Sequence, residues 1–216
     1  MLQKIQRFGG AMLMPSILFA FFGLVVGLTS ILKNPNLVGS IATEGTLWYN
    51  FWFVVEQGGW TIFNQMPVVF ALGIPIGLAK KANGRAALEA FLIYMVFNYF
   101  INGFLTQFKF FGVDVTPALK LPTGITRIAG AITLDTSIIG SIVIASISVW
   151  IHNKFFDKKL PELLGIFQGS TFVILVGFII MIPAAFLTAL LWPKVQLGIA
   201  ALQGFLKVSG VAGVFT

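Results

Sequence analysis

The feature that most constrains this chain is a set of long, nearly uncharged apolar runs. The first, Ala11 to Leu32, has no charged residue between Arg7 and Lys33. About 20 mostly apolar residues are enough for a helix to cross the hydrocarbon core of a bilayer. Only 10% of the residues are charged, against about 25% in a typical soluble domain. Lipid must therefore be the solvent for much of this chain.

Further runs of the same kind predict an all-α, polytopic membrane protein with about five transmembrane helices plus interfacial amphipathic helices. The predicted crossings are 11–32, 62–79, 86–108, 128–151 and 163–192. The last apolar stretch, 195–216, is broken by Lys207 and by glycines, so we expect a partial or interfacial helix there. The aromatic-rich connection 33–59 and the mixed connection 152–162 are expected to lie at the membrane surface.

The basic residues indicate which side of the membrane each connection faces. There are 14 Lys and Arg residues against 7 Asp and Glu, in small groups between the apolar runs. This scattered pattern is typical of membrane-surface loops and argues against nucleic-acid binding. The compact clusters at 80–85 and 152–159 predict that these connections, and the N-terminus, are cytoplasmic.

The residue types also limit the chemistry. The chain has no Cys and one His, His152, so neither thiolate chemistry nor a metal site is expected. No phosphate-binding loop, nucleophile motif or pair of catalytic carboxylates is present. We therefore expect no cofactor, no metal and no catalytic residue in this chain.

Small residues recur at four-residue spacing, which places them on one face of a helix. Another backbone can approach such a face closely. The residues are Gly23 with Gly27, Gly73 with Gly77, Gly165 with Gly169, and the stripe Ser137, Ser141, Ala145 and Ser148. Packing within the chain is the more frequent use of such faces, and a subunit interface is the alternative.

Polar residues inside the apolar runs are the candidates for a substrate site. Tyr94, Asn98 and Asn102 lie four apart on the third predicted helix. This stripe either lines a polar pathway or sugar site, or joins two helices by hydrogen bonds. Asp135 is expected to cap a helix that starts at Thr136. Glu89 is expected to pair with Arg85, one helical turn before it.

Long ordered blocks of the sequence also carry a family resemblance. They resemble the membrane IIC component of the bacterial phosphoenolpyruvate-dependent sugar phosphotransferase system, glucose superfamily, most closely its alpha-glucoside and maltose branch. The blocks are IQRFGGAMLMPSILFAFFGLVVGL (5–28), GGWTIFNQMPVVFALGIPIGLAKKANGRAAL (58–88), GVDVT (112–116), LDTSIIGSIVIASISVWIHNKFFDKKLPELLGIFQGSTFV (134–173) and WPKVQLGIAALQGFL (192–206).

The resemblance implies an arrangement for the whole protein. Members of this family are ten-helix dimers in the bacterial cytoplasmic membrane, whose first five helices hold the dimer and whose second half carries most sugar contacts. Residues 1–192 would then be a five-helix scaffold and dimer-interface domain, and 193–216 a partial or interfacial helix leading to a C-terminal transport domain. The implied partners are the lipid bilayer, a second copy of the chain, the IIA and IIB phosphocarrier domains and the sugar.

The resemblance carries over no catalytic residue, because the family's sugar-contact motifs follow the fifth helix. The resemblance therefore implies that this chain is the scaffold half of a permease that translocates an alpha-glucoside for coupled phosphorylation. The alternative is a self-standing channel or secondary transporter. It would need a polar path along Tyr94, Asn98, Asn102 and Asp135.

Overall fold

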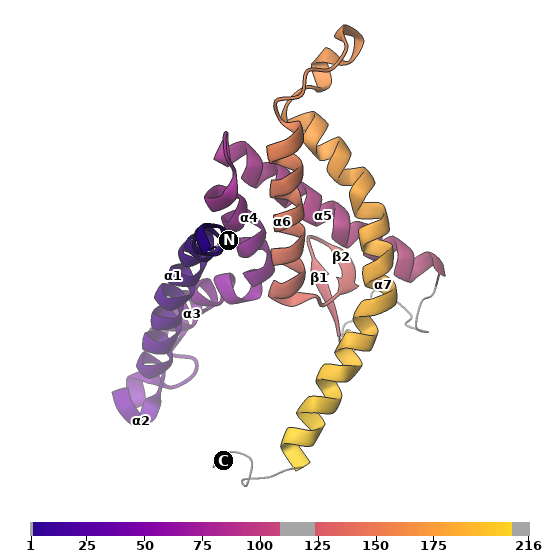
Figure 1. Cartoon of the computed structure of the whole chain (residues 1–216). Helices are drawn as coiled ribbons and strands as arrows, with labels where there is room; N and C mark the ends of the chain where they lie inside the picture. Colours follow the sequence, from indigo (N-terminus) through magenta and orange to yellow (C-terminus); the bar gives the residue numbers. More distant parts are fainter. Residues whose placement is uncertain (1, 109–123, 209–216) are drawn as a thin grey trace. The chain divides into compact units, whose positions relative to one another are not determined.

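The computed structural model describes residues 2–108 and 124–208, which are mostly helical (Figure 1). Four helices in this part are long and apolar enough to cross a membrane: α1 (Leu2–Leu32), α5 (Asn83–Phe108), α6 (Ser137–Phe155) and α7 (Ser170–Val208). α3 (Leu47–Asn64) and α4 (Met66–Leu78) pass the same test only as a pair, with a 60° bend between them, which makes four or five crossings in the described residues. The predicted fold class, a multi-pass helical membrane protein, is confirmed.

The chain divides into two compact units, described here one at a time. Unit 1 comprises residues 1–91 and 137–153, and unit 2 comprises residues 92–136 and 154–216. Unit 1 contains α1, α2 (Pro35–Val38), the 3-10 turn η1 (Ser40–Ala42), α3, α4, the start of α5 and nearly all of α6. Unit 2 contains the rest of α5, β1 (Ile125–Ile128), β2 (Ala131–Leu134), the 3-10 turn η3 (Glu162–Phe167) and α7. The block 112–116 and the last residues, 209–216, lie outside the described residues.

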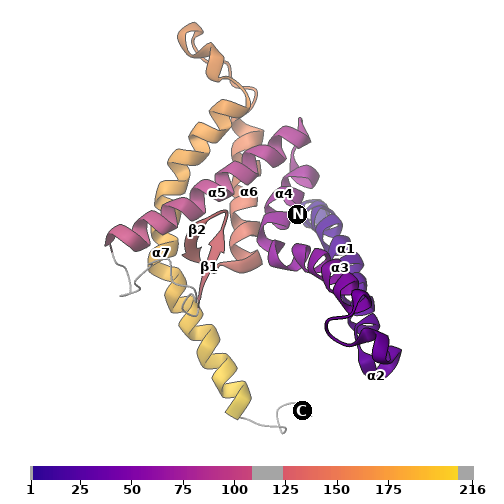
Figure 2. The same cartoon turned by 180° about the vertical axis from the view of Figure 1, so that it is seen from behind.

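In unit 1, α3 and α4 together follow α1 in the opposite direction. α3 contacts the C-terminal half of α1, where a Cβ atom at Gly59 would lie 2.8 Å from the Val26 side chain. α4 contacts the N-terminal half, where a Cβ at Gly73 would lie 2.5 Å from Pro15. The pairing of α1 with α3 is visible in Figure 1 and, from behind, in Figure 2. The bent pair therefore lies beside α1 along both halves of that helix.

The bend between α3 and α4 has a local cause. Pro67 lies in the first turn of α4 and has no N–H, so it cannot continue the hydrogen-bond ladder of α3. Gln65 separates the helices with φ −107° and ψ 18°, outside the helical range. The sequence prediction instead ended a surface segment near residue 59 and began a crossing at 62. Hydropathy did not locate the bend, because the predicted apolar run, 62–79, extends across it.

The core of unit 1 lies where α1, α4 and α6 meet. Phe70 and Ile74 of α4 and Ala145 of α6 are buried there, and Met12 and Phe19 of α1 pack against them. The Phe19 and Phe70 rings stack with their centroids 5.8 Å apart. Large side chains from two helices therefore fill the space left by a small residue on the third.

The predicted small stripe of α6 faces the interior over part of its length. Ser141 and Ser148 are buried, and each hydroxyl donates a 2.8 Å hydrogen bond to a carbonyl of its own helix, at Ile138 and Ile144. These local bonds satisfy the hydroxyls without a partner from another helix. Ser137 is the first residue of α6 and is exposed.

A β-hairpin occupies residues that were predicted to begin the fourth crossing, so that helix prediction, 128–151, was wrong at its start. β1 and β2 pair antiparallel, with Ile128 opposite Ala131. Between them, Ala129 and Gly130 have φ values of 47° and 87°, as a two-residue hairpin turn requires. Helix α6 begins at Ser137, one residue after the predicted start at Thr136. The cap by Asp135 stays a prediction.

The last predicted helix also changes its bounds. A single helix, α7, runs from Ser170 to Val208 through Pro183 and Pro193, and η3 precedes it. The pair Gly165 and Gly169 therefore does not lie on a membrane helix, contrary to the prediction. Gly165 is in η3, and Gly169 precedes α7 with a φ of 74°, a left-handed conformation that favours glycine.

Candidate functional site

The polar stripe predicted on the third crossing lies on the part of α5 that belongs to unit 2. Tyr94 and Asn98 are fully buried and Asn102 is partly buried. Their four-residue spacing places the three side chains on one helix face, as the sequence indicated. The face they share is turned toward the hairpin.

Side chains of α5 hydrogen-bond to the hairpin along its length. Asn102 Nδ2 donates to the Ile132 carbonyl at 2.7 Å, and Tyr99 Oη donates to the Ala129 carbonyl in the turn at 2.8 Å. Asn98 Oδ1 accepts from Thr133 Oγ1 at 3.2 Å. A two-stranded hairpin leaves carbonyls unpaired at its edges, and residues 131–134 are buried, where water cannot bind them. α5 supplies the missing donors.

Helix α7 holds the base of the hairpin. Trp192 Nε1 donates to the Asp135 carbonyl at 2.8 Å, and Gln196 Nε2 donates to the Gly124 carbonyl at 2.8 Å. The Asp135 N–H bonds to the same Gly124 carbonyl at 2.9 Å, which closes the hairpin. A Cβ at Gly124 would lie 2.7 Å from Gln196 Oε1, so glycine permits this approach.

Trp192 and Gln196 were not among the residues that the sequence singled out. The signal that could have found them is the hairpin itself, ITRIAGAITL (125–134), in which two β-branched runs flank an Ala-Gly turn. A hairpin predicted there would have required donors from neighbouring helices. A hydropathy search counts the same residues as an ordinary apolar run.

One atom of the stripe is left without a hydrogen bond. Tyr94 Oη is buried and has no partner among the described residues, whereas Asn98 Nδ2 donates to the Tyr94 carbonyl at 2.8 Å. A buried hydroxyl without a partner is costly, so such an atom is the place where a further polar group could bind. Of the three predicted residues, Tyr94 therefore keeps the most capacity for a ligand.

A second buried polar cluster lies in unit 1 and corrects the prediction for Glu89. Glu89 Oε2 lies 2.6 Å from His152 Nδ1, and both side chains are at most 2% exposed. Arg85, the predicted partner, is exposed. Arg85 lies in the first turn of α5, at the exposed end of the helix, whereas Glu89 lies one turn further along and is buried. Spacing within α5 could not indicate that α6 would bring His152 to it.

The contact at the other ring nitrogen of His152 shows which nitrogen carries a hydrogen. His152 Nε2 lies 2.9 Å from the Lys81 carbonyl, and a carbonyl only accepts, so Nε2 carries a hydrogen. Next to it, Asn153 Oδ1 accepts from the Lys80 N–H at 2.9 Å. These contacts tie the C-terminal end of α6 to the connection between α4 and α5. Across the described ranges, no three His, Asp or Glu residues gather in a group that could hold a metal ion.

The glycine faces differ in what they contact. A Cβ at Gly77 would overlap Ala11, and one at Gly73 would overlap Pro15, so this face is used by α1 of the same chain. A Cβ at Gly23 would lie 3.7 Å from the Phe63 ring, an ordinary contact. Gly27 has no atom within 4 Å of its Cβ position in the described structure.

Comparison with known families agrees with this architecture. Residues 9–216 match the family model described as phosphotransferase system, EIIC. The chain belongs to this EIIC family. The match covers nearly all of the chain, so both units and the hairpin between α5 and α6 lie within the family region.

Curated relatives of this EIIC chain match it over its full length. It is 56% identical to the PTS system alpha-glucoside-specific EIICB component of Leptotrichia buccalis and 54% identical to the PTS system maltose-specific EIICB component of Bacillus subtilis. It is 51% identical to a phosphotransferase IIC component of Escherichia coli. Each match covers 100% of this chain, but only 40%, 41% and 59% of those relatives. The chain thus spans between two fifths and three fifths of these relatives' length.

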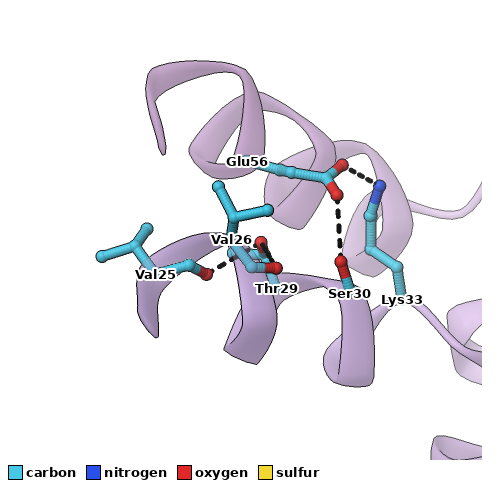
Figure 3. Close-up of polar contacts among 6 residues, drawn as sticks. All are labelled: Val25, Val26, Thr29, Ser30, Lys33 and Glu56. Atoms are coloured by element: carbon cyan, nitrogen blue, oxygen red, sulfur yellow. Dashed lines mark hydrogen bonds and ion pairs between the residues drawn. The ribbon is translucent and has the colours of Figure 1, made fainter. Parts of the chain in front are cut away.

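A third polar cluster in this EIIC chain joins the C-terminal end of α1 to α3 (Figure 3). Lys33 Nζ forms an ion pair with Glu56 Oε2, and Ser30 Oγ donates to Glu56 Oε1 at 3.2 Å. Lys33 Nζ also lies 5.4 Å from the centroid of the Tyr49 ring and 5.2 Å from that of Phe53. Two rings of the aromatic-rich connection predicted at 33–59 therefore lie beside one lysine.

Proposed function

We propose that this EIIC chain is the N-terminal scaffold part of a permease that translocates an alpha-glucoside such as maltose for coupled phosphorylation. The observation that carries the proposal is the identity of 54–56% over the whole chain to components named alpha-glucoside-specific and maltose-specific. Identity this high over the whole of this chain favours a shared substrate class. The bacterial cytoplasmic membrane is the proposed location.

The polar contacts favour a supporting role over a self-standing channel. Two of the three stripe residues, Asn98 and Asn102, have their amides engaged with the hairpin or their own helix. A path for solute along this stripe would have to break those bonds. We propose that the stripe holds the hairpin, and that Tyr94 is the one member with capacity for a sugar hydroxyl.

The scaffold proposal includes a domain division and partners. We propose that residues 1–192 form the scaffold and that 193–216, which continue α7, lead toward a transport part. Two relatives are named EIICB components, which supports a IIB domain as the phosphoryl donor to the translocated sugar. By the same family reasoning we propose IIA as the donor to IIB and a second copy of the chain as the dimer partner. The face around Gly27, which no described atom fills, is available for that contact.

Uptake measurements test the transport proposal. Proteoliposomes with the chain alone should not accumulate labelled maltose. Proteoliposomes with the chain joined to the downstream part of a relative, plus IIB, IIA and phosphoenolpyruvate, should accumulate maltose phosphate. Accumulation by the chain alone would overturn the scaffold proposal and favour the self-standing transporter. A joined protein that phosphorylates glucose but no alpha-glucoside would overturn the substrate proposal.

Labelling from one side of the membrane tests the proposed orientation. We propose that the N-terminus and the connections at 80–85 and 152–162 are cytoplasmic, because their lysines and arginines cluster at helix ends. Gly84 is exposed and its Cβ position is open, so Gly84→Cys should be harmless. In intact cells this cysteine should resist an impermeant thiol reagent and react after lysis. Equal labelling in both conditions would reverse the orientation.

A further inference from the structure

The connection between α6 and α7 presents four large apolar side chains to its surroundings. Within η3, Leu163 is 94% exposed and Ile166 is 84% exposed. Leu164 and Phe167 are exposed as well. Figure 1 shows this turn, in orange, projecting beyond the first residues of α7. A contiguous apolar group of this kind marks a surface that binds something apolar.

The 3-10 geometry of η3 sorts its residues into rows. Residues three apart in such a helix lie above one another. Leu163 and Ile166 form one row, and Leu164 and Phe167 form the next. Glu162 and Gly165 form the third row, which is the polar or small one. η3 is therefore amphipathic, with two of its three rows apolar.

Three exposed lysines precede this turn. They are Lys154, Lys158 and Lys159, and the acidic residues of the same stretch are Asp157 and Glu162. The ammonium groups of Lys154 and Lys158 lie 5.4 and 5.2 Å from the centroid of the Phe155 ring. That ring packs edge-on against Phe172 in the first turn of α7, with centroids 5.9 Å apart. The lysines are thus held beside the end of a membrane-crossing helix.

The location of η3 indicates that lipid is its binding partner. α6 and α7 are both long and apolar enough to cross the bilayer, so the chain enters and leaves this connection at the membrane surface. Lipid headgroups are within reach of both ends, whereas a protein partner would have to be recruited. Lysines around an apolar face are the pattern of a segment that lies in the interface, with ammonium groups at the phosphates.

We propose that η3 is a lipid-binding element that inserts its two apolar rows into the headgroup region while Lys154, Lys158 and Lys159 contact the phosphates of anionic phospholipids. The element fixes the depth of the α6–α7 connection in the membrane. This inference rests on membrane embedding alone. It does not depend on which solute the protein transports.

Spin labelling of the whole chain in vesicles tests the insertion directly. Because the chain has no Cys, Leu163→Cys, Ile166→Cys and Glu162→Cys each give one labelling site. Leu175→Cys on α7, whose native side chain is 47% exposed, serves as the lipid-facing reference. The vesicles contain phosphatidylethanolamine and phosphatidylglycerol. Collision of each label with oxygen, which concentrates in lipid, is compared with collision with a water-soluble nickel chelate.

The expected result is a lipid-like ratio of collision rates at Leu163 and Ile166, approaching that at Leu175, and a more water-like ratio at Glu162. Water-like ratios at all three η3 sites would overturn the proposal. Protection from both reagents would overturn it too, in favour of a protein partner covering the turn. Replacing Lys154, Lys158 and Lys159 by Gln should lower the inserted-to-free ratio by about fivefold per lysine in anionic vesicles. It should have no such effect in purely zwitterionic vesicles, and equal loss in both would contradict the headgroup contact.

Discussion

The two units attach their parts in opposite ways. In unit 1, α4 meets α1 through glycines so close that a single added carbon at Gly73 would overlap Pro15. In unit 2, the hairpin meets α5 and α7 through hydrogen bonds from Asn102, Trp192 and Gln196. Helices satisfy their own backbone groups, so they associate by close packing. A hairpin does not, so its neighbours must supply donors.

The largest loss of stability is expected at the buried pair of Glu89 and His152 in unit 1, where two ionisable side chains, and not apolar packing, hold α5 and α6 together. His152→Leu leaves Glu89 buried without its partner. Removing one member of a buried pair costs about 3–5 kcal/mol, so the unfolding free energy in detergent should fall by that amount. Titration with a denaturing detergent, followed by circular dichroism, measures it.

A double substitution is the control for that loss. Glu89→Met together with His152→Leu removes both polar groups and keeps the volume. Well-packed apolar replacements of a buried pair are often neutral or stabilising, so most of the loss should be recovered. A double variant as unstable as the single one would mean that His152 stabilises the fold by some contact other than its pairing with Glu89.

The glycine contact itself should respond to one methyl group. Gly77→Ala would push a carbon into Ala11, whose backbone Cα lies 2.6 Å from the Cβ position. Overpacking of this kind costs about 1–3 kcal/mol. Gly10→Ala, also on α1 and with an open Cβ position, should instead stabilise its helix by about 0.5–1 kcal/mol. Thermal unfolding in the same detergent should give shifts of opposite sign, and equal shifts would refute the packing argument.

In unit 2, loss of a single donor should have a moderate effect. Asn102→Leu removes the bond to the Ile132 carbonyl, and such bonds between membrane segments are worth about 0.6–2 kcal/mol. Gln107→Leu on the same helix, at an exposed site, should change stability little. If Asn102→Leu left stability intact but raised the KM for maltose uptake of the joined protein, the residue would be a sugar ligand and not a hairpin support.

The smallest effect is expected at the polar cluster of α1 and α3 in Figure 3. Ser30→Ala removes the hydroxyl that donates to Glu56, while Lys33 keeps its ion pair with the same carboxylate. A loss of about 0.5 kcal/mol is expected. Lys33→Met should cost more, because it leaves Glu56 with the serine alone. The reverse order of the two variants would show that the ion pair is not what holds α3 to α1.

Hydropathy predicted the crossings because it reports on the solvent of the chain, and lipid requires apolar residues whatever the neighbouring helices do. It could not separate residues 128–134 from the helix that follows, since buried strands and membrane helices are both apolar. It also joined the end of α3 to α4, because the break depends on one residue, Pro67. The predicted ends of the helices therefore differ from the observed ends where local backbone geometry, and not polarity, determines the structure.

For the candidate sites too, the sequence predicted what depends on a single helix and missed what depends on tertiary packing. The four-residue spacing of Tyr94, Asn98 and Asn102 placed them on one face because that periodicity is a property of a single helix. What the face contacts depends on the hairpin, which is a tertiary feature. Likewise, the pairing of Glu89 with Arg85 used only distances within one helix. His152 is far away in sequence, and only the packing of α6 brings it near.

The length of α7 has a mechanical consequence. A helix of 39 residues is about 58 Å long, roughly twice the thickness of a hydrocarbon core. Its attachment to the hairpin, at Trp192 and Gln196, acts as a fulcrum, and Val208 lies about 18 Å beyond Gln196 along the axis. A 10° tilt about that point would move Val208 by about 3 Å. α7 is thus a lever whose shorter arm, beyond Gln196, turns a small rotation into a displacement the size of a side-chain contact.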